Sequence, residues 1–130
     1  MKNFKLNEKD ILSNQDWTFP TTTYYGPGRF NEIAKFCEEF DIKNPLIVTD
    51  SGSKDLPFIK KLIALLSKNN IKSDLFYNIS PNPRDDEISK GCDQFKNGSH
   101  DSIIAIGGGS AMDGGKSICL TVNSETPLWD

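Results

Sequence analysis

Apolar residues recur along this chain in two patterns, short β-rich runs and longer stretches with helical spacing. Runs rich in β-branched and aromatic residues predict strands over residues 18–25, 46–49, 72–77 and 102–106. Apolar residues three and four apart predict amphipathic helices over residues 29–40, 55–69, 84–97 and 111–122. Glycine and proline clusters separate several of these segments, which supports the predicted element boundaries.

Strands that alternate with helices indicate βαβ units and a parallel sheet. We therefore predict an α/β fold, a Rossmann-like parallel sheet with helices on both faces. Residues 1–16 are polar and lack periodicity, so we expect an N-terminal extension there and one α/β domain over residues 17–130. Ligands of such sheets bind beyond the carboxyl ends of the strands. Asp50 and Gly107, which each follow a buried strand, mark the expected site.

Composition removes several classes of function. The chain has 130 residues and a formal net charge of −3, which argues against a general nucleic-acid partner. No apolar run approaches the roughly 20 residues that span a bilayer, and no secretory h-region opens the chain. We expect a cytoplasmic protein without a membrane partner. The cysteines Cys37, Cys92 and Cys119 are expected on buried helix faces rather than in a redox or metal site.

Three consecutive glycines, 107–109, join a predicted strand to a predicted helix. Glycine allows dihedral angles closed to other residues and lets a ligand approach the main chain. Ser110 is expected to cap this helix, and the free N–H groups at a helix start attract phosphate. Gly114 and Gly115 fall inside the helix, where each costs about 1 kcal/mol relative to alanine. They therefore indicate close packing of the helix on the sheet or on a ligand.

Two familiar phosphate-binding motifs fail at this segment. The dinucleotide fingerprint Gly-x-Gly-x-x-Gly, started at Gly107, would need a glycine where Met112 stands. A P-loop ending at Lys116 would need a glycine at Ser110, and Asp113 would place a carboxylate in its phosphate cradle.

The string Gly-Gly-Gly-Ser-x-x-Asp-x-x-Lys over residues 107–116 resembles the signature of iron-dependent (group III) alcohol dehydrogenases. Further segments similar to that family occur in the expected order at residues 25–28, 46–50, 81–83 and 127–130. The resemblance covers about 18–130 and implies a dehydroquinate synthase-like N-terminal domain that binds NAD.

The resemblance also implies roles for individual residues. Residues 107–110, which are Gly107, Gly108, Gly109 and Ser110, would hold the pyrophosphate of the dinucleotide. Asp50 would accept hydrogen bonds from the adenosine ribose, and its charge would repel the 2′-phosphate of NADP, so NAD is favoured. Asp113 and Lys116 would lie near the nicotinamide, and Pro81 with Pro83 would shape a loop beside the cofactor. The alternatives are a helix-capping Asp50, an Asp113–Lys116 ion pair and plain turn-forming prolines.

The family's chemistry needs Fe2+ or another divalent metal, bound by one Asp and three His. The chain has one histidine, His100, which we expect to be a solvated loop residue. We therefore expect the C-terminal helical metal domain to be absent, and these residues to contain no catalytic group and to be inactive alone. The full-length enzyme would interconvert a small alcohol and its aldehyde or ketone. The sequence leaves open whether that enzyme forms a homo-oligomer. The alternative is a stand-alone nucleotide- or phosphate-binding module, which the coding sequence past residue 130 would distinguish.

Overall fold

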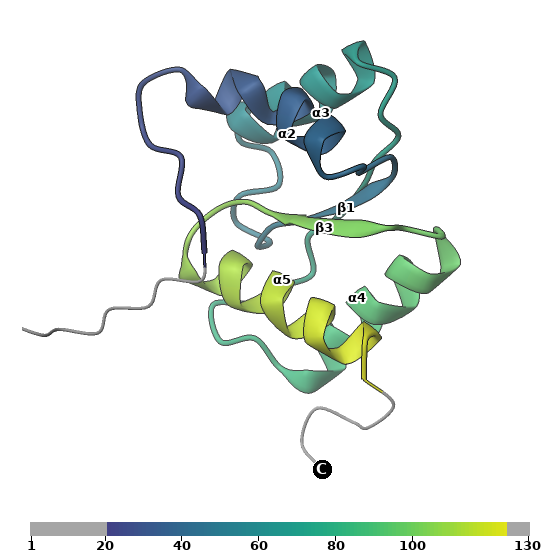
Figure 1. Ribbon diagram of the computed structural model, residues 1–130. Helices are drawn as coiled ribbons and strands as arrows, with labels where there is room; N and C mark the ends of the chain where they lie inside the picture. Colours follow the sequence, from purple (N-terminus) through teal and green to yellow (C-terminus); the bar gives the residue numbers. More distant parts are fainter. Residues whose placement is uncertain (1–20, 125–130) are drawn as a thin grey trace, which may run out of the picture.

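A computed structural model describes residues 21–124, which form a three-stranded parallel sheet with helices on both faces (Figure 1). The strands are β1 (Pro45–Val48), β2 (Asp74–Phe76) and β3 (Ser102–Ala105). The helices are η1 (Arg29–Glu32, a 3-10 helix), α2 (Ile33–Glu39), α3 (Pro57–Lys68), α4 (Asp85–Asn97) and α5 (Gly109–Val122). The predicted α/β fold is confirmed. None of the helices within residues 21–124 is long and apolar enough to cross a membrane.

Strand β1 is the centre of the sheet, because the strand order is β2-β1-β3. Both neighbours run parallel to it, and Val48 lies opposite Phe76 on one side and Ala105 on the other. All four residues of β1 are buried. A strand covered on both faces and flanked on both edges has no solvent side, which explains its unbroken apolar sequence.

Two apolar layers hold the sheet. Leu46 and Val48 belong to the cluster shared with α4 and α5, which includes Ile118. Ile47 points the other way, into a cluster with Cys37 of α2 and residues of α3. Figure 1 shows this arrangement, with α2 and α3 on one side of the sheet and α4 and α5 on the other.

Helix α5 approaches the sheet closely through its two internal glycines. A β-carbon on Gly115 would lie 2.6 Å from the Cβ atom of Ala105 in β3. A β-carbon on Gly114 would lie 2.9 Å from the Cδ1 atom of Ile79, which follows β2. The close packing predicted from these glycines is confirmed, and the sheet side of α5 is where it occurs.

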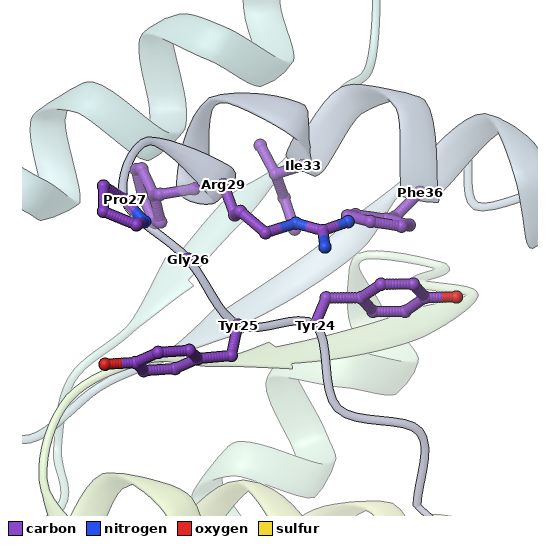
Figure 2. Close-up of a pocket in the computed structure, with 8 residues that line it drawn as sticks. Tyr24, Tyr25, Gly26, Pro27, Arg29, Ile33 and Phe36 are labelled. Atoms are coloured by element: carbon purple, nitrogen blue, oxygen red, sulfur yellow. The ribbon is translucent and has the colours of Figure 1, made fainter.

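The strand predicted over 18–25 is wrong for the part that the structure describes. Residues 18–20 lie outside the described residues, and residues 21–25 form no strand. The ring of Tyr24 instead packs on Phe36 of α2, with 4.4 Å between centroids, and the guanidinium of Arg29 lies 5.0 Å from the Tyr24 centroid. Figure 2 shows Tyr24 and Tyr25 pointing to opposite sides of this segment. β propensity alone therefore did not produce strand pairing here.

Cys37 and Cys92 are buried as predicted, and burial raises the pKa of both thiols. The prediction for Cys119 is wrong, because that side chain is exposed. Helix α5 buries a narrow stripe that includes Ala111 and Ile118. One residue beyond Ile118 is a rotation of about 100° around the helix axis, which carries Cys119 out of the stripe.

His100 was expected to be solvated, and this prediction is also wrong. The residue is buried, and its ring lies 6.0 Å from that of Phe95, between centroids. Its Nδ1 atom is 3.0 Å from the carbonyl oxygen of Asn44. Ser99, with a φ of 52°, turns the chain back after α4 and brings the histidine under the start of the sheet. The sequence gives no periodic signal for such a turn.

Candidate functional site

The carboxyl ends of β1 and β3 lie side by side and lead to helices on opposite faces of the sheet. The connection after β1 leads to α3, whose Leu62 packs with Ile47. The connection after β3 leads directly to α5, whose Ile118 packs with Val48 on the other face. Diverging connections leave a crevice between adjacent parallel strands, which is where open α/β sheets bind ligands.

A cavity of about 310 Å³ lies at this crevice. Seven residues line it: Asp50, Ser51, Gly52, Ile79, Pro81, Gly108 and Ser110. They come from the segments that follow β1, β2 and β3. Four of the eight residues predicted for the cofactor therefore surround one hollow, although they are up to 60 positions apart in the sequence (110 − 50).

The three glycines of the loop have different surroundings. Gly107 has a φ of 136°, and a β-carbon there would lie 3.0 Å from the Cβ atom of Ala111 and 3.1 Å from the Oδ2 atom of Asp50. This position requires glycine for conformation and for space. Among residues 21–124, nothing lies within 4 Å of a β-carbon position on Gly108 or Gly109. Their lack of side chains leaves space at the start of α5 that no other described residue fills.

Ser110 is not the helix cap that the sequence predicted. Gly108 is the N-cap of α5, and no side chain caps this helix end. The Ser110 hydroxyl donates instead to the carbonyl oxygen of Pro81, at 3.0 Å. The helix begins at Gly109, two residues earlier than it would with Ser110 as its cap. Ser110 therefore ties the start of α5 to the loop that follows β2.

The other end of that loop is held by Glu87, which is buried in the first turn of α4. Its Oε2 atom accepts hydrogen bonds from the backbone N–H of Arg84 at 3.1 Å and of Ser80 at 3.2 Å, and from the Ser80 hydroxyl at 3.2 Å. Burial raises the pKa of this carboxyl, but the backbone and hydroxyl donors outweigh it and the net pKa is lowered. The charged carboxylate thus fixes the loop that carries Pro81.

Asp50 lies two residues beyond the end of β1, half-buried beside the glycine loop. Its Oδ2 atom accepts a hydrogen bond from the Ser53 hydroxyl at 2.9 Å. The alternative reading of Asp50 as the cap of the next helix is wrong, because Leu56 is the N-cap of α3. The carboxylate belongs to the edge of the cavity.

The remaining predicted residues lie apart from this hollow. Asp113 and Lys116 are exposed on α5 and do not line the cavity. Within the part of the chain that the structure describes, no ion pair joins these two side chains. Pro83 is half-buried and lies just before α4, outside the cavity lining.

Several residues near the cavity carried no functional signal in the sequence. Ser51, Gly52 and Ile79 line it, and Ser53 binds Asp50. Thr49 is fully buried, and its Oγ1 atom has no hydrogen-bond partner within residues 21–124. The motif Asp-x-x-Ser after a strand is the one signal that could have pointed to Ser53, because such spacing is typical of a side-chain-stabilised turn.

A larger hollow, of about 650 Å³, lies between the segment before η1 and the start of the helices (Figure 2). Aromatic and apolar side chains dominate its lining, among them Tyr24, Phe30 and Phe36. It contains none of the residues predicted to bind a cofactor, and the end of the sheet does not contribute to it. Size therefore does not select the site, whereas the convergence of glycines and a carboxylate at the strand ends does.

Comparison with known proteins agrees with the geometry of this site. The family described as iron-containing alcohol dehydrogenase matches residues 20–130. The chain belongs to the iron-containing alcohol dehydrogenase family. The match includes the glycine loop and every residue of the cavity.

Relatives within the iron-containing alcohol dehydrogenase family include enzymes from yeast and bacteria. Alcohol dehydrogenase 4 of Schizosaccharomyces pombe is 37% identical over 111 residues, which are 85% of this chain and 26% of the relative. NADH-dependent butanol dehydrogenase A of Clostridium acetobutylicum is 32% identical over 116 residues, 88% of this chain and 30% of the relative. The crystal structure of sulfoacetaldehyde reductase from Bifidobacterium kashiwanohense in complex with NAD+ matches with a TM-score of 0.78 and 26% identity, over 87% of this chain and 30% of that one.

The chain therefore spans less than a third of the length of these iron-containing alcohol dehydrogenases. Its residues do not fit the metal of the family name. The sequence has one histidine, and within residues 21–124 no group of three His, Cys, Asp or Glu side chains could hold a metal ion. His100 is buried against Asn44, at the amino ends of the strands and away from the cavity.

Proposed function

We propose that this chain is the NAD-binding part of a metal-dependent alcohol dehydrogenase that interconverts a small alcohol and its aldehyde or ketone. The observation that carries the proposal is the cavity at the start of α5, which the open position of Gly108 and the acidic residue Asp50 both line. A relative named as an NADH-dependent butanol dehydrogenase and one solved with NAD+ support the choice of cofactor and of substrate class.

The glycine loop offers a place for the cofactor's pyrophosphate. The start of α5, a 14-residue helix, carries N–H groups without intrahelical partners and the positive end of the helix dipole. No atom of the described part of the chain lies within 4 Å of a β-carbon position on Gly108 or Gly109, so an anion can approach their amides. The same open space would be lost with larger residues.

Asp50 is proposed to accept hydrogen bonds from the adenosine ribose. It follows β1, one strand away from the glycine loop, and lines the same cavity. A carboxylate accepts hydrogen bonds from two vicinal hydroxyls, whereas it repels a 2′-phosphate. The expected preference is therefore for NAD over NADP.

Bound NAD supplies the hydride acceptor for alcohol oxidation. The residues of this chain would bind and orient it: Gly108 and Gly109 at the phosphates, Asp50 at the ribose, and Pro81 in the wall beside the start of α5. Asp113 and Lys116 follow along α5 and are proposed to lie toward the nicotinamide, as the family signature implies. The metal ligands are not among these residues, so no step of the metal chemistry is assigned to them.

Titration of the 15N-labelled chain with NAD+, followed by NMR, tests the proposal. We expect the amide signals of Gly107, Gly108 and Gly109 to shift in a saturable way, together with that of Asp50. A weak complex is sufficient, because fast exchange reports binding even at millimolar Kd. Saturable shifts confined to other parts of the chain, or none at the loop, would overturn the assignment.

Two comparison ligands separate the proposed function from its alternative. NADP+ is expected to bind more weakly than NAD+ to the unaltered chain, and Asp50→Gly is expected to reduce this difference. Inorganic phosphate shifting the loop amides where NAD+ does not would instead support a phosphate-binding module. Equal affinity for NAD+ and NADP+ would remove the role given to Asp50.

A further inference from the structure

The two carboxylate oxygens of Asp50 have different surroundings. Oδ2 accepts the hydrogen bond from the Ser53 hydroxyl and lies 3.1 Å from the β-carbon position of Gly107. Oδ1 lies on the side of Gly52, 3.3 Å from the β-carbon position of that residue. Gly52 lines the cavity and Gly107 does not. Oδ2 is therefore engaged by Ser53, whereas Oδ1 lies next to a residue that lines the cavity.

Ser53 is itself firmly held in this turn. Its backbone N–H donates to the carbonyl oxygen of Asp50 at 3.1 Å, so the main chain and the side chain of Ser53 bind the same residue. Its own carbonyl oxygen accepts from the N–H of Leu56 at 3.0 Å, which connects the turn to the start of α3. A donor fixed in this way fixes the group that accepts from it.

We propose that Ser53 is a positioning residue that sets the preference for NAD over NADP by fixing the rotation of the Asp50 carboxylate, an inference that rests on the proposed function. Rotation about the last bond of an aspartate is soft, so an unanchored carboxylate samples many orientations. With Oδ2 occupied by Ser53, Oδ1 keeps its lone pairs toward the cavity, where ribose hydroxyls can donate to them. The anchored charge also cannot turn away from a 2′-phosphate.

The resemblance to the family supplied no role for Ser53. The inference comes from the 2.9 Å hydrogen bond and from the unequal surroundings of the two oxygens. The proposal does not make Ser53 a ligand of the cofactor, because Ser53 is not among the residues that line the cavity. Its effect must pass through Asp50.

The test measures the Kd for NADH and for NADPH with the unaltered chain, Ser53→Ala, Ser53→Thr and Ser67→Ala. Ser53→Ala is expected to weaken NADH binding roughly threefold to tenfold, as for loss of a charge-assisted hydrogen bond that acts indirectly. NADPH affinity is expected to change less, so the ratio of the two Kd values moves toward one. Ser53→Thr keeps the hydroxyl and should keep the ratio. Ser67, exposed on α3, is the matched control and should leave both Kd values unchanged.

A double-mutant cycle separates an effect through Asp50 from a general loss of structure. In an Asp50→Ala background, Ser53→Ala is expected to change neither Kd further. An equal loss of affinity in both backgrounds would overturn the proposal, as would an unchanged NADH to NADPH ratio in Ser53→Ala. A chain that binds neither dinucleotide would overturn the proposed function and this inference together. A chain that prefers NADH but is insensitive to Ser53→Ala would overturn this inference alone.

Discussion

Ile118 of α5 occupies the space that a side chain on Gly91 of α4 would need. A β-carbon on Gly91 would lie 2.9 Å from the Cγ1 atom of Ile118 and 3.1 Å from the Cε1 atom of Phe76. Both neighbours belong to the core beneath β1. This contact sets how closely α4 and α5 approach each other. Helix α5 begins at Gly109, the last residue of the glycine loop.

Gly91→Ala is expected to lower the free energy of unfolding by about 1–3 kcal/mol, the usual cost of overpacking a core. The gain in helix propensity, about 1 kcal/mol, offsets only part of it. Urea denaturation followed by circular dichroism measures the change. Ser89→Ala, at an exposed position of the same helix, is the control and should stay within about 0.5 kcal/mol. A Gly91→Ala variant as stable as the unaltered chain would show that the two helices can separate freely.

Thr49→Val is expected to stabilise the chain. The Thr49 hydroxyl is fully buried and has no hydrogen-bond partner among the residues that the structure describes, so folding desolvates it without compensation from them. Valine has nearly the same shape and removes that cost, which should raise the free energy of unfolding by about 1 kcal/mol. Thr49→Ser keeps the hydroxyl and loses a methyl group, so it should be less stable than the unaltered chain. Destabilisation by valine would mean that the hydroxyl has a partner in solution.

Acid should destabilise the fold through Glu87 and Asp101. The pKa of each carboxyl is lowered in the folded chain, because hydrogen bonds to the carboxylate outweigh the effect of burial, which raises the pKa. The donors to Glu87 are Arg84 and Ser80. The donors to Asp101 are Lys43, Ser102 and Asn44. A carboxyl with a lowered folded pKa stabilises the fold above its unfolded pKa and loses that contribution as pH falls through the folded value.

The loss of stability should therefore begin near the ordinary values of 4.5 for glutamate and 3.8 for aspartate, and continue below them. Thermal unfolding between pH 6 and pH 3 measures it. Glu87→Gln removes the titrating group, so its stability should be lower at pH 6 and should fall less steeply in acid. Equal slopes for the two proteins would show that Glu87 does not contribute.

Gly108→Val should separate binding from stability. The backbone of Gly108, at φ −82° and ψ −166°, is extended and suits valine, and its β-carbon position is open. The melting temperature should fall only slightly, because valine is a poorer N-cap than glycine. NADH affinity should fall roughly tenfold or more, the equivalent of one lost charge-assisted hydrogen bond. Met112→Val, on an exposed position of the same helix, is the control for both measurements. Unchanged NADH affinity in Gly108→Val would show that the phosphates of the cofactor bind away from Gly108.

The parts of this fold with regular hydrophobic spacing could be predicted from the sequence. The run 46–49 became β1 with a shift of one residue, and the predicted helix 84–97 became α4 almost unchanged. The segment 18–25 failed because a strand needs a partner, and composition does not reveal one. His100 and Cys119 failed because a turn with positive φ and a one-residue rotation of a helix decide burial there.

Residues of the candidate site could be predicted from the sequence only where they directly follow a predicted strand. Asp50 and Gly107 were found in this way, and the structure places them side by side. The partner of the Ser110 hydroxyl could not be found, because Pro81 is 29 positions away and only the meeting of the two segments creates the contact. Ser53 and Thr49 were missed for a related reason, since their importance depends on which atoms surround them.

The central position of β1 also determines which part of the fold should unfold last. Its amides are flanked by β2 and β3, whereas within residues 21–124 each of those strands has one neighbour in the sheet. Exchange of backbone hydrogens with solvent should therefore be slowest in β1, and should need near-global unfolding there. Thr49 and Asp50 extend directly from that slow-exchanging strand. Asp50 is thus attached to the part of the fold that unfolds last. The other loops that line the cavity can fluctuate without displacing this residue.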